Sequence, residues 1–280
     1  MHAAQAAILP DGRRLHLHHG PIDLVIEVFG PGRVAAYEKA TTRFQSLLSD
    51  LVGHLPQLRR PVSGPSQITD PVAQRMFAAV APFDQFITPM AAVAGSVADE
   101  MLSVIRADPQ IDKAYVNNGG DVAFHLAAGQ GIVAAVPGFG TIMIKGDTPV
   151  RGIATSGWGG RSHSLGIADS VTVLAPTAAM ADAAATLIAN AVDLPGHSGI
   201  ERRPAHELSP DSDLGARLVT VGVPLLSAPE KHAALTRGLA VARDFARRDL
   251  IIAAGLMVQG ETYVTNPKRM LIEKKDPIHA

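Results

Sequence analysis

Three short segments in the middle of the chain carry residue types that could bind a phosphate-bearing ligand. They are the turn Asn118, Gly119, Gly120 and Asp121, the loop Ala154, Thr155, Ser156 and Gly157, and the pair Asp182 and Thr186. Glycines allow backbone N–H groups to turn to one side, as anion-binding turns require. Carboxylate, hydroxyl and phosphate oxygens are the ligands that Mg²⁺ prefers. The sequence therefore concentrates its binding chemistry between residues 114 and 192.

Each of these segments also has an ordinary structural interpretation. The Gly119-Gly120 pair lies between two β-like runs, and such dipeptides are the commonest signal of a hairpin turn. Asp182 near the start of an expected helix complements the helix dipole, and Thr186 can bond to a backbone carbonyl. Their spacing of four residues also places both oxygens on one helix face. Taken one at a time, the segments favour the structural interpretations.

Other motifs point to chemistry less strongly. His163 is a candidate catalytic general base in a loop, without an identified partner. His16 and His18 would share one face of a strand, but no carboxylate stands beside them at a recognised metal-ligand spacing. Residues 129–134 match the dinucleotide fingerprint G-x-G-x-x-A, yet Pro137 prevents the helix that a Rossmann turn needs. No G-x-S-x-G elbow is present, which sets serine hydrolase chemistry aside.

The composition narrows the class of protein. Hydrophobic residues make up 47% of the 280 residues and charged residues 18%, which is typical of a compact globular chain. A formal net charge of −1 predicts no binding to nucleic acid or to an anionic membrane. The absence of cysteine excludes disulfides, thiolate nucleophiles and cysteine-ligated metals. We find no secretory signal and no apolar run of about 18 residues, so we expect a cytoplasmic protein.

The elements that must position these residues are predicted to form an α+β fold. Strands are expected at 15–17, 22–29, 114–116, 122–126, 132–136, 141–144, 152–155, 171–174 and 217–225, with a closing hairpin at 250–265. Helices are expected at 34–51, 71–80, 91–105, 177–192 and 229–248, with a Pro- and Ser-rich linker at 56–67. Strand groups separated by helices favour a largely antiparallel sheet with packed helices.

We expect a single domain over residues 1–265, followed by a loosely held polar tail at 266–280. The order of hairpin, helix and sheet recurs roughly in both parts of the chain, about 1–110 and 111–265. This order would suit an internally duplicated arrangement, although no repeat is visible at the level of residues.

Read together and in order, four motifs resemble the ApbE-like superfamily, whose best-known members are FAD:protein FMN transferases. The motifs are residues 89–95, 117–121, 152–157 and 169–175, the last of which leads into the helix with Asp182 and Thr186. The chain looks most similar to a bacterial and archaeal family within that superfamily. The resemblance covers residues 89–192 and implies a T-fold-like architecture with a cleft for a flavin nucleotide.

The resemblance also implies roles for individual residues. Asp182 and Thr186 would ligate Mg²⁺ together with a backbone carbonyl, that of Ala92 or Ala94. The turn 118–121 and the loop 154–157 would line the site for FAD or FMN. The implied reaction is Mg²⁺-dependent cleavage of the FAD pyrophosphate, with transfer of FMN to a protein acceptor.

Two features of the transferases are missing from the chain. The transferases carry a lysine in an Ala-Lys-Gly segment, where this chain runs Val93-Ala94-Gly95-Ser96. They also carry a His-x-x-Asp-Pro turn, where this chain has His163 through Asp169 without a proline. Binding of the cofactor would then survive without covalent transfer of FMN. The alternative is a non-catalytic accessory protein of cofactor or sulfur metabolism that binds another small ligand. The sequence leaves open whether the chain is an enzyme and whether it forms a homo-oligomer.

Overall fold

The structure is a computed structural model that describes residues 3–64, 67–107, 109–266 and 272–273. The chain divides into two compact units that interleave along the sequence. Unit 1 comprises Met1–Ile132, Lys145–Ala154 and Pro176–Ala183, and unit 2 comprises Val133–Ile144, Thr155–Ala175 and Ala184–Ala280. The arrangement into one domain or two similar halves stays a prediction.

The strands of unit 1 form an antiparallel array in the order β1-β2-β3-β4-β5-β8. Their bounds are β1 Gln5–Ile8, β2 Leu15–His19, β3 Ile22–Phe29, β4 Lys113–Asn118, β5 Asp121–Leu126 and β8 Gly152–Ser156. Buried and more exposed residues alternate along β3 and β4, as expected when one face of a sheet packs on a core. The predicted α+β class with a largely antiparallel sheet is confirmed.

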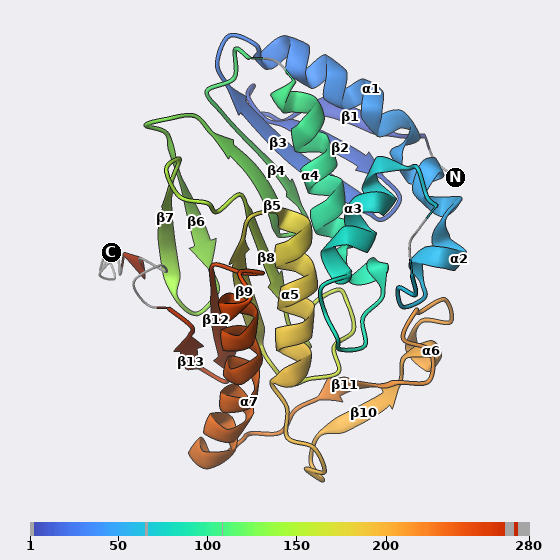
Figure 1. Ribbon diagram of the computed structural model, residues 1–280, viewed down its shortest axis with the longest axis vertical. Helices are drawn as coiled ribbons and strands as arrows, with labels where there is room; N and C mark the ends of the chain where they lie inside the picture. Colours follow the sequence, from blue (N-terminus) through green and yellow to red (C-terminus); the bar gives the residue numbers. More distant parts are fainter. Residues whose placement is uncertain (1–2, 65–66, 108, 267–271, 274–280) are drawn as a thin grey trace. The chain divides into compact units, whose positions relative to one another are not determined.

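The helices of unit 1 are α1 Arg33–Val52, α2 Leu55–Leu58, α3 Pro71–Val80, the 3₁₀ helix η1 Pro89–Ala92 and α4 Val93–Arg106. Of these helices, α1 and α4 pack on the strands, and α3 and η1 pack on α4 (Figure 1). Phe44 and Leu47 of α1 and Met101 of α4 are fully or almost fully buried in the same core as Leu24 and Val116 of the strands. The helical period of the apolar residues thus fills the space over the sheet.

Unit 2 contains three small groups of strands and one long helix. The antiparallel strands β9 Ser170–Ala175, β12 Ala253–Val258 and β13 Glu261–Val264 lie side by side, and α7 Ala228–Arg247 packs on β12 and β13 (Figure 1). β10 Glu201–Pro204 pairs with β11 Leu218–Gly222, and the short α6 Ala205–Leu208 follows β10. The capping box of Ser227 and Glu230 starts α7, the helix expected at 229–248.

Several predicted elements need correction. The expected helix 91–105 is broken at Ala92, whose φ of −123° separates η1 from α4. The expected linker 56–67 contains most of α2, which begins at Leu55; within that linker, residues 65–66 lie outside the described residues. The strands β1 and β10 and the helix α6 were not predicted, because four-residue elements carry too little periodicity.

The segment 113–174 does not run as a simple meander. β6 Gly131–Val136 and β7 Gly140–Lys145 leave the main array and form a separate sheet in the order β14-β7-β6. Their neighbour β14 comprises Ile272–Glu273, within the expected tail 266–280, most of which lies outside the described residues. β5 pairs instead with β8, which comes later in the chain. A pattern of alternating residues cannot specify which strands become neighbours.

Candidate functional site

The predicted turn 118–121 is the tight turn of the β4–β5 hairpin. Asn118 pairs with Asp121, and the two glycines between them have φ values of +64° and +114°, which only glycine adopts readily. The side chain of Asn117 accepts a hydrogen bond from the Gly120 N–H at 2.8 Å. The hairpin interpretation is confirmed, and one glycine N–H is engaged within the turn itself.

The hairpin and the start of α4 are joined through the backbone of residues 94 and 95. The Asn118 Nδ2 group donates to the Ala94 carbonyl at 3.1 Å, and the Gly95 N–H donates to the Asp182 carboxylate at 3.0 Å. Asp182 lies in α5 Ala178–Ala191, 87 residues beyond Gly95. Three predicted segments of unit 1 therefore meet at the first turn of α4.

The electrostatics of this meeting point favour the protonated form of Asp182. Burial of the side chain raises its pKa well above the usual value, and the nearby charge of Asp121 raises the pKa further. The Gly95 and Ala94 N–H groups act in the opposite direction, and Asp99 adds a smaller upward shift. A bound cation would relieve the repulsion between these carboxylates.

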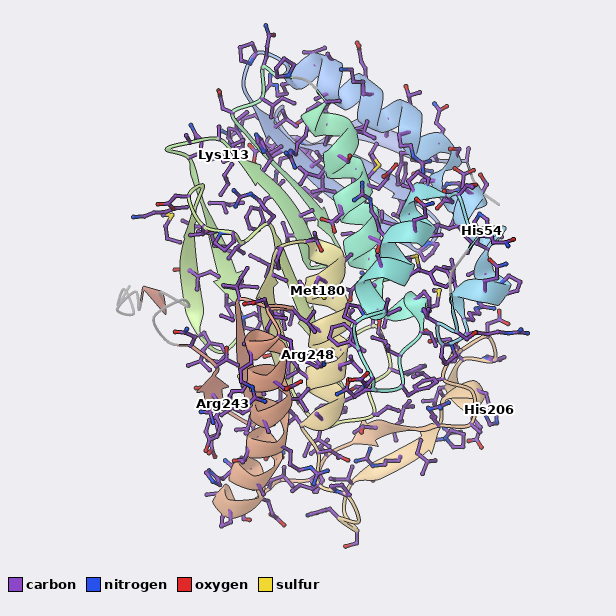
Figure 2. All side chains as sticks on the ribbon, in the orientation of Figure 1. His54, Lys113, Met180, His206, Arg243 and Arg248 are labelled. Carbon is purple, nitrogen blue, oxygen red and sulfur yellow. The ribbon has the colours of Figure 1, made fainter. Side chains whose placement is uncertain are left out.

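The N-terminus of α5 is fully capped by protein groups. Thr177 accepts a hydrogen bond from the N–H of Met180 at 3.1 Å. Met180 lies in the first turn of α5 (Figure 2). Asp99, which projects from α4, accepts bonds from the N–H groups of Ala178 at 3.1 Å and Ala179 at 2.8 Å. Because these three N–H groups have partners, they do not offer a phosphate site. No local pattern around Asp99 indicates this role, since its partners lie 79 and 80 residues away.

Two glycines allow the chain to approach the start of α5 closely. A Cβ atom on Gly95 would lie 2.2 Å from the Ala178 carbonyl oxygen, and one on Gly152 would lie 2.2 Å from the Ala178 nitrogen. Both distances are far shorter than any real contact, and the obstructing atoms belong to the backbone. The small residues predicted near position 95 therefore serve helix packing at this point.

The predicted loop 154–157 is structured mainly by hydrogen bonds and close packing. Ala154 is fully buried in unit 1. In unit 2, the hydroxyl groups of Thr155 and Thr172 lie 2.8 Å apart, and a Cβ on Gly157 would lie 2.2 Å from the Asp169 carbonyl oxygen. Ser156 lies next to them at the end of β8 and is partly exposed.

The segment between β8 and β9 carries the other candidate residues of unit 2. The Trp158 indole N–H donates to the Asp169 carboxylate at 3.3 Å, and Asp169 also accepts from the Gln259 N–H. His163 is partly buried in this segment. Thr186 lies in α5 four residues beyond Asp182, so the two side chains leave the helix on the same side, as the spacing predicted.

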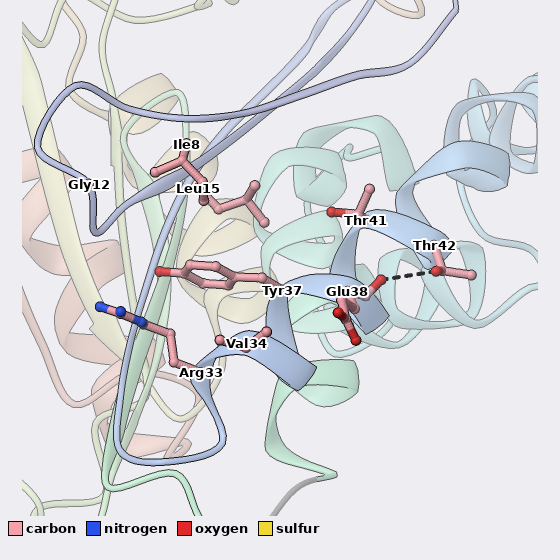
Figure 3. A pocket seen from close by; sticks show the side chains of 9 residues that line it. All are labelled: Ile8, Gly12, Leu15, Arg33, Val34, Tyr37, Glu38, Thr41 and Thr42. Atoms are coloured by element: carbon pink, nitrogen blue, oxygen red, sulfur yellow. Dashed lines mark hydrogen bonds between the residues drawn. The ribbon is translucent and has the colours of Figure 1, made fainter.

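A separate cavity of about 580 Å³ lies in unit 1, where the β1–β2 hairpin faces α1 (Figure 3). Leu15 and Val34 contribute apolar lining, while Arg33 and Glu38 contribute charge. None of the predicted site residues lines this cavity. Over the described ranges, no group of three or more His, Cys, Asp or Glu residues could hold a metal ion. No helix among those ranges is long and apolar enough to cross a membrane.

Comparison with known proteins defines the class. The family described as AbpE bacteria matches residues 6–264, so the chain belongs to that family. The resemblance to the ApbE-like superfamily, inferred from four motifs, is thereby confirmed.

Among curated proteins, the chain is similar to the UPF0280 protein of Methanopyrus kandleri, at 38% identity over 131 residues, which cover 42% of this chain and 48% of that protein. The UPF0280 protein of Methanothermobacter thermautotrophicus is 39% identical over 119 residues, which cover 39% and 44%. The chain thus spans about half the length of the curated relatives it matches.

Two solved structures are similar over most of the chain. The flavinyl transferase ApbE of Pseudomonas stutzeri, in its apo form, has a TM-score of 0.46 and 12% identity, covering 97% of this chain and 98% of that one. A mutant of the flavin transferase ApbE of Vibrio cholerae has a TM-score of 0.47 and 15% identity, covering 90% and 97%.

Proposed function

We propose that the chain binds the phosphate groups of a flavin nucleotide, FAD or FMN, through a Mg²⁺ ion held by Asp121, Asp182 and the Ala94 carbonyl. One observation carries this proposal. The charge of Asp121 acts on the half-buried side chain of Asp182 at the point where the backbone of residues 94 and 95 meets α5. Two carboxylates that lie close together repel each other, and a bound cation offsets this repulsion.

The residues present fit Mg²⁺ in number and type. Mg²⁺ usually takes one or two carboxylates from the protein, keeps several waters and binds substrate phosphates. The Ala94 carbonyl suits this role better than that of Ala92, because the Asn118 amide already orients it and Ala92 is fully buried. Thr186 stays a predicted further ligand.

The residues around the carboxylates would fix their orientation. The Gly95 N–H holds one oxygen of Asp182, and Asn118 holds the Ala94 carbonyl. When bound, Mg²⁺ would neutralise charge on the phosphates. The flavin part of the proposal rests on the order of the four sequence motifs. The lysine and the proline of the transferase motifs are missing from this chain, which favours binding of FMN or FAD over transfer of FMN to a protein acceptor.

A cytoplasmic location stays a prediction.

The binding test compares FAD affinity with and without Mg²⁺ by fluorescence titration. We expect Mg²⁺ to raise the affinity of the native protein about tenfold, and Asp182→Asn to abolish that rise. The control Asp23→Asn removes an exposed carboxylate on β3 and should keep the full Mg²⁺ effect. Equal Mg²⁺ effects in native protein and Asp182→Asn would refute the metal assignment. A protein that does not bind FAD under either condition would favour the accessory alternative.

A catalytic role is tested separately by release of AMP from FAD in the presence of Mg²⁺. His163 is the proposed general base that would take a proton from water as it hydrolyses FAD to FMN and AMP, so His163→Gln should remove AMP release and leave FAD affinity unchanged. A native protein that binds FAD without releasing AMP would restrict the function to binding.

A further inference from the structure

The N-terminal half of α4 forms hydrogen bonds with the first half of α5 at two points. The Gly95 N–H bonds to the Asp182 carboxylate at 3.0 Å, and the Asp99 carboxylate accepts bonds from the N–H groups of Ala178 and Ala179. Gly95 and Asp99 are four residues apart and share one face of α4, and Ala178 and Asp182 have the same spacing on α5. The two helices are therefore joined by a pair of matched contacts one turn apart.

We propose that Asp99 is a positioning residue that sets the Asp182 carboxylate against the backbone of residues 94 and 95. Its own carboxylate does so by holding the first two N–H groups of α5. This inference rests on the proposed function, because it assigns the second contact a role at the Mg²⁺ site. Asp99 would act through α5 and is not itself placed among the metal ligands.

The Asp99 carboxylate reaches from α4 to the first two N–H groups of α5. Burial raises the pKa of its carboxyl, which means that the charged form is destabilised by its surroundings. Thr177 caps α5 locally at Met180, and Asp99 adds bonds from another helix to the N–H groups of Ala178 and Ala179. Bonds between a carboxylate and two backbone N–H groups are strong and directional, which suits exact placement.

The packing at the start of α5 transmits this placement to Asp182. Gly95 and Gly152 leave no room for even one extra carbon beside Ala178. Ala178 and Asp182 are separated by about 6 Å of regular helix, at 1.5 Å per residue. A shift at the first turn therefore moves the Asp182 carboxylate relative to the Gly95 N–H.

The test uses Asp99→Asn and a matched capping variant, Asp70→Asn. Asp70 caps α3 through the Ala73 N–H at 2.8 Å, and it has no assigned part in the metal site. Mn²⁺ binding to the full chain is measured by electron paramagnetic resonance, at a temperature where circular dichroism shows each variant to be folded. We expect Asp99→Asn to weaken Mn²⁺ binding about tenfold and Asp70→Asn to leave it unchanged.

A second measurement needs no metal. Amide hydrogen exchange at Gly95 reports the bond to Asp182, and it should become at least about fivefold faster in Asp99→Asn and stay unchanged in Asp70→Asn. Native Mn²⁺ affinity together with native Gly95 exchange in Asp99→Asn would overturn the positioning role. If the native protein binds no Mn²⁺, the proposed function fails, and the metal-site role of Asp99 fails with it; faster Gly95 exchange would still support the placement of Asp182. If Asp99→Asn does not fold, Asp99→Ser replaces it in both measurements.

Discussion

The Asp182 region of unit 1 and the Thr155 region of unit 2 were predicted as parts of the same binding chemistry, yet their polar groups are used differently. In unit 1, Asp182 is half-buried, and both desolvation and the nearby charge of Asp121 raise its pKa. In unit 2, Thr155 bonds to Thr172, and Asp169 joins Trp158 to Gln259. Neutral and singly charged groups that bond to one another stabilise a loop, whereas neighbouring carboxylates favour a cation.

The largest expected effects come from Gly152→Ala in unit 1 and Gly157→Ala in unit 2. Each added Cβ would lie 2.2 Å from a backbone atom, so each should lower the free energy of unfolding by about 1–3 kcal/mol or more. Only Gly152→Ala displaces the start of α5, so only this variant should also weaken Mn²⁺ binding. Denaturant unfolding and Mn²⁺ titration check both. Equal loss of Mn²⁺ binding in the two variants would remove the distinction between the regions.

The pH dependence of stability tests the charge at Asp182. Because the folded pKa lies above the ordinary value of 3.8, ionisation of this carboxyl destabilises the metal-free fold at pH values above the folded pKa. The cost disappears as the pH falls below the unfolded value, since both states are then protonated. Asp182→Asn should therefore raise the Tm of the metal-free protein at pH 7 by about 2–4 °C, and the gain should vanish near pH 3.

Thermal unfolding followed by circular dichroism measures this gain, with added Mg²⁺ as the control. The ion should stabilise the native protein more than Asp182→Asn, which reverses or reduces the difference in Tm. If metal-free Asp182→Asn has a lower Tm than the metal-free native protein at pH 7, the Asp182 carboxylate stabilises the fold. Repulsion from Asp121 would then not dominate at this position.

The smallest effect is expected from Thr155→Val in unit 2. The change removes the hydrogen bond to Thr172, a side chain that is only 1% exposed, and should lower the free energy of unfolding by about 0.5–1.5 kcal/mol. Mn²⁺ affinity should not change. Chemical denaturation and Mn²⁺ titration measure these two quantities, and FAD titration measures the flavin affinity of the same variant. A loss of FAD affinity larger than tenfold, at unchanged stability, would assign the Thr155 loop a direct binding role.

Local sequence patterns predicted the elements that local interactions determine. The helix expected at 71–80 is α3, and its N-cap Asp70 accepts a bond from the Ala73 N–H. The glycine pair at 119–120 predicted the β4–β5 turn, and the closing hairpin expected at 250–265 is formed by β12 and β13. A cap or a two-residue turn depends on groups within a few residues of each other, so its signal is present in a short window.

Features that depend on distant partners could not be predicted in this way. The break between η1 and α4 lies within a run of small residues whose sequence predicts one continuous helix. The sequences of β6 and β7 likewise predict further strands of one meander. The order of the four motifs indicated the family, but it did not indicate that Asn118 would orient the Ala94 carbonyl.

The sequence by itself determined the residue types of the candidate site, the α+β class and the family. Glycine turns and helix caps depend on residues close together in the chain, and the order of the motifs can be read directly from the sequence. Only the tertiary structure decided that Asp121 acts on Asp182, that the Gly95 N–H bonds to Asp182, and that Asp99 holds the start of α5. These relations join residues from about 60 to almost 90 positions apart, and folding alone brings such groups within hydrogen-bonding or electrostatic range.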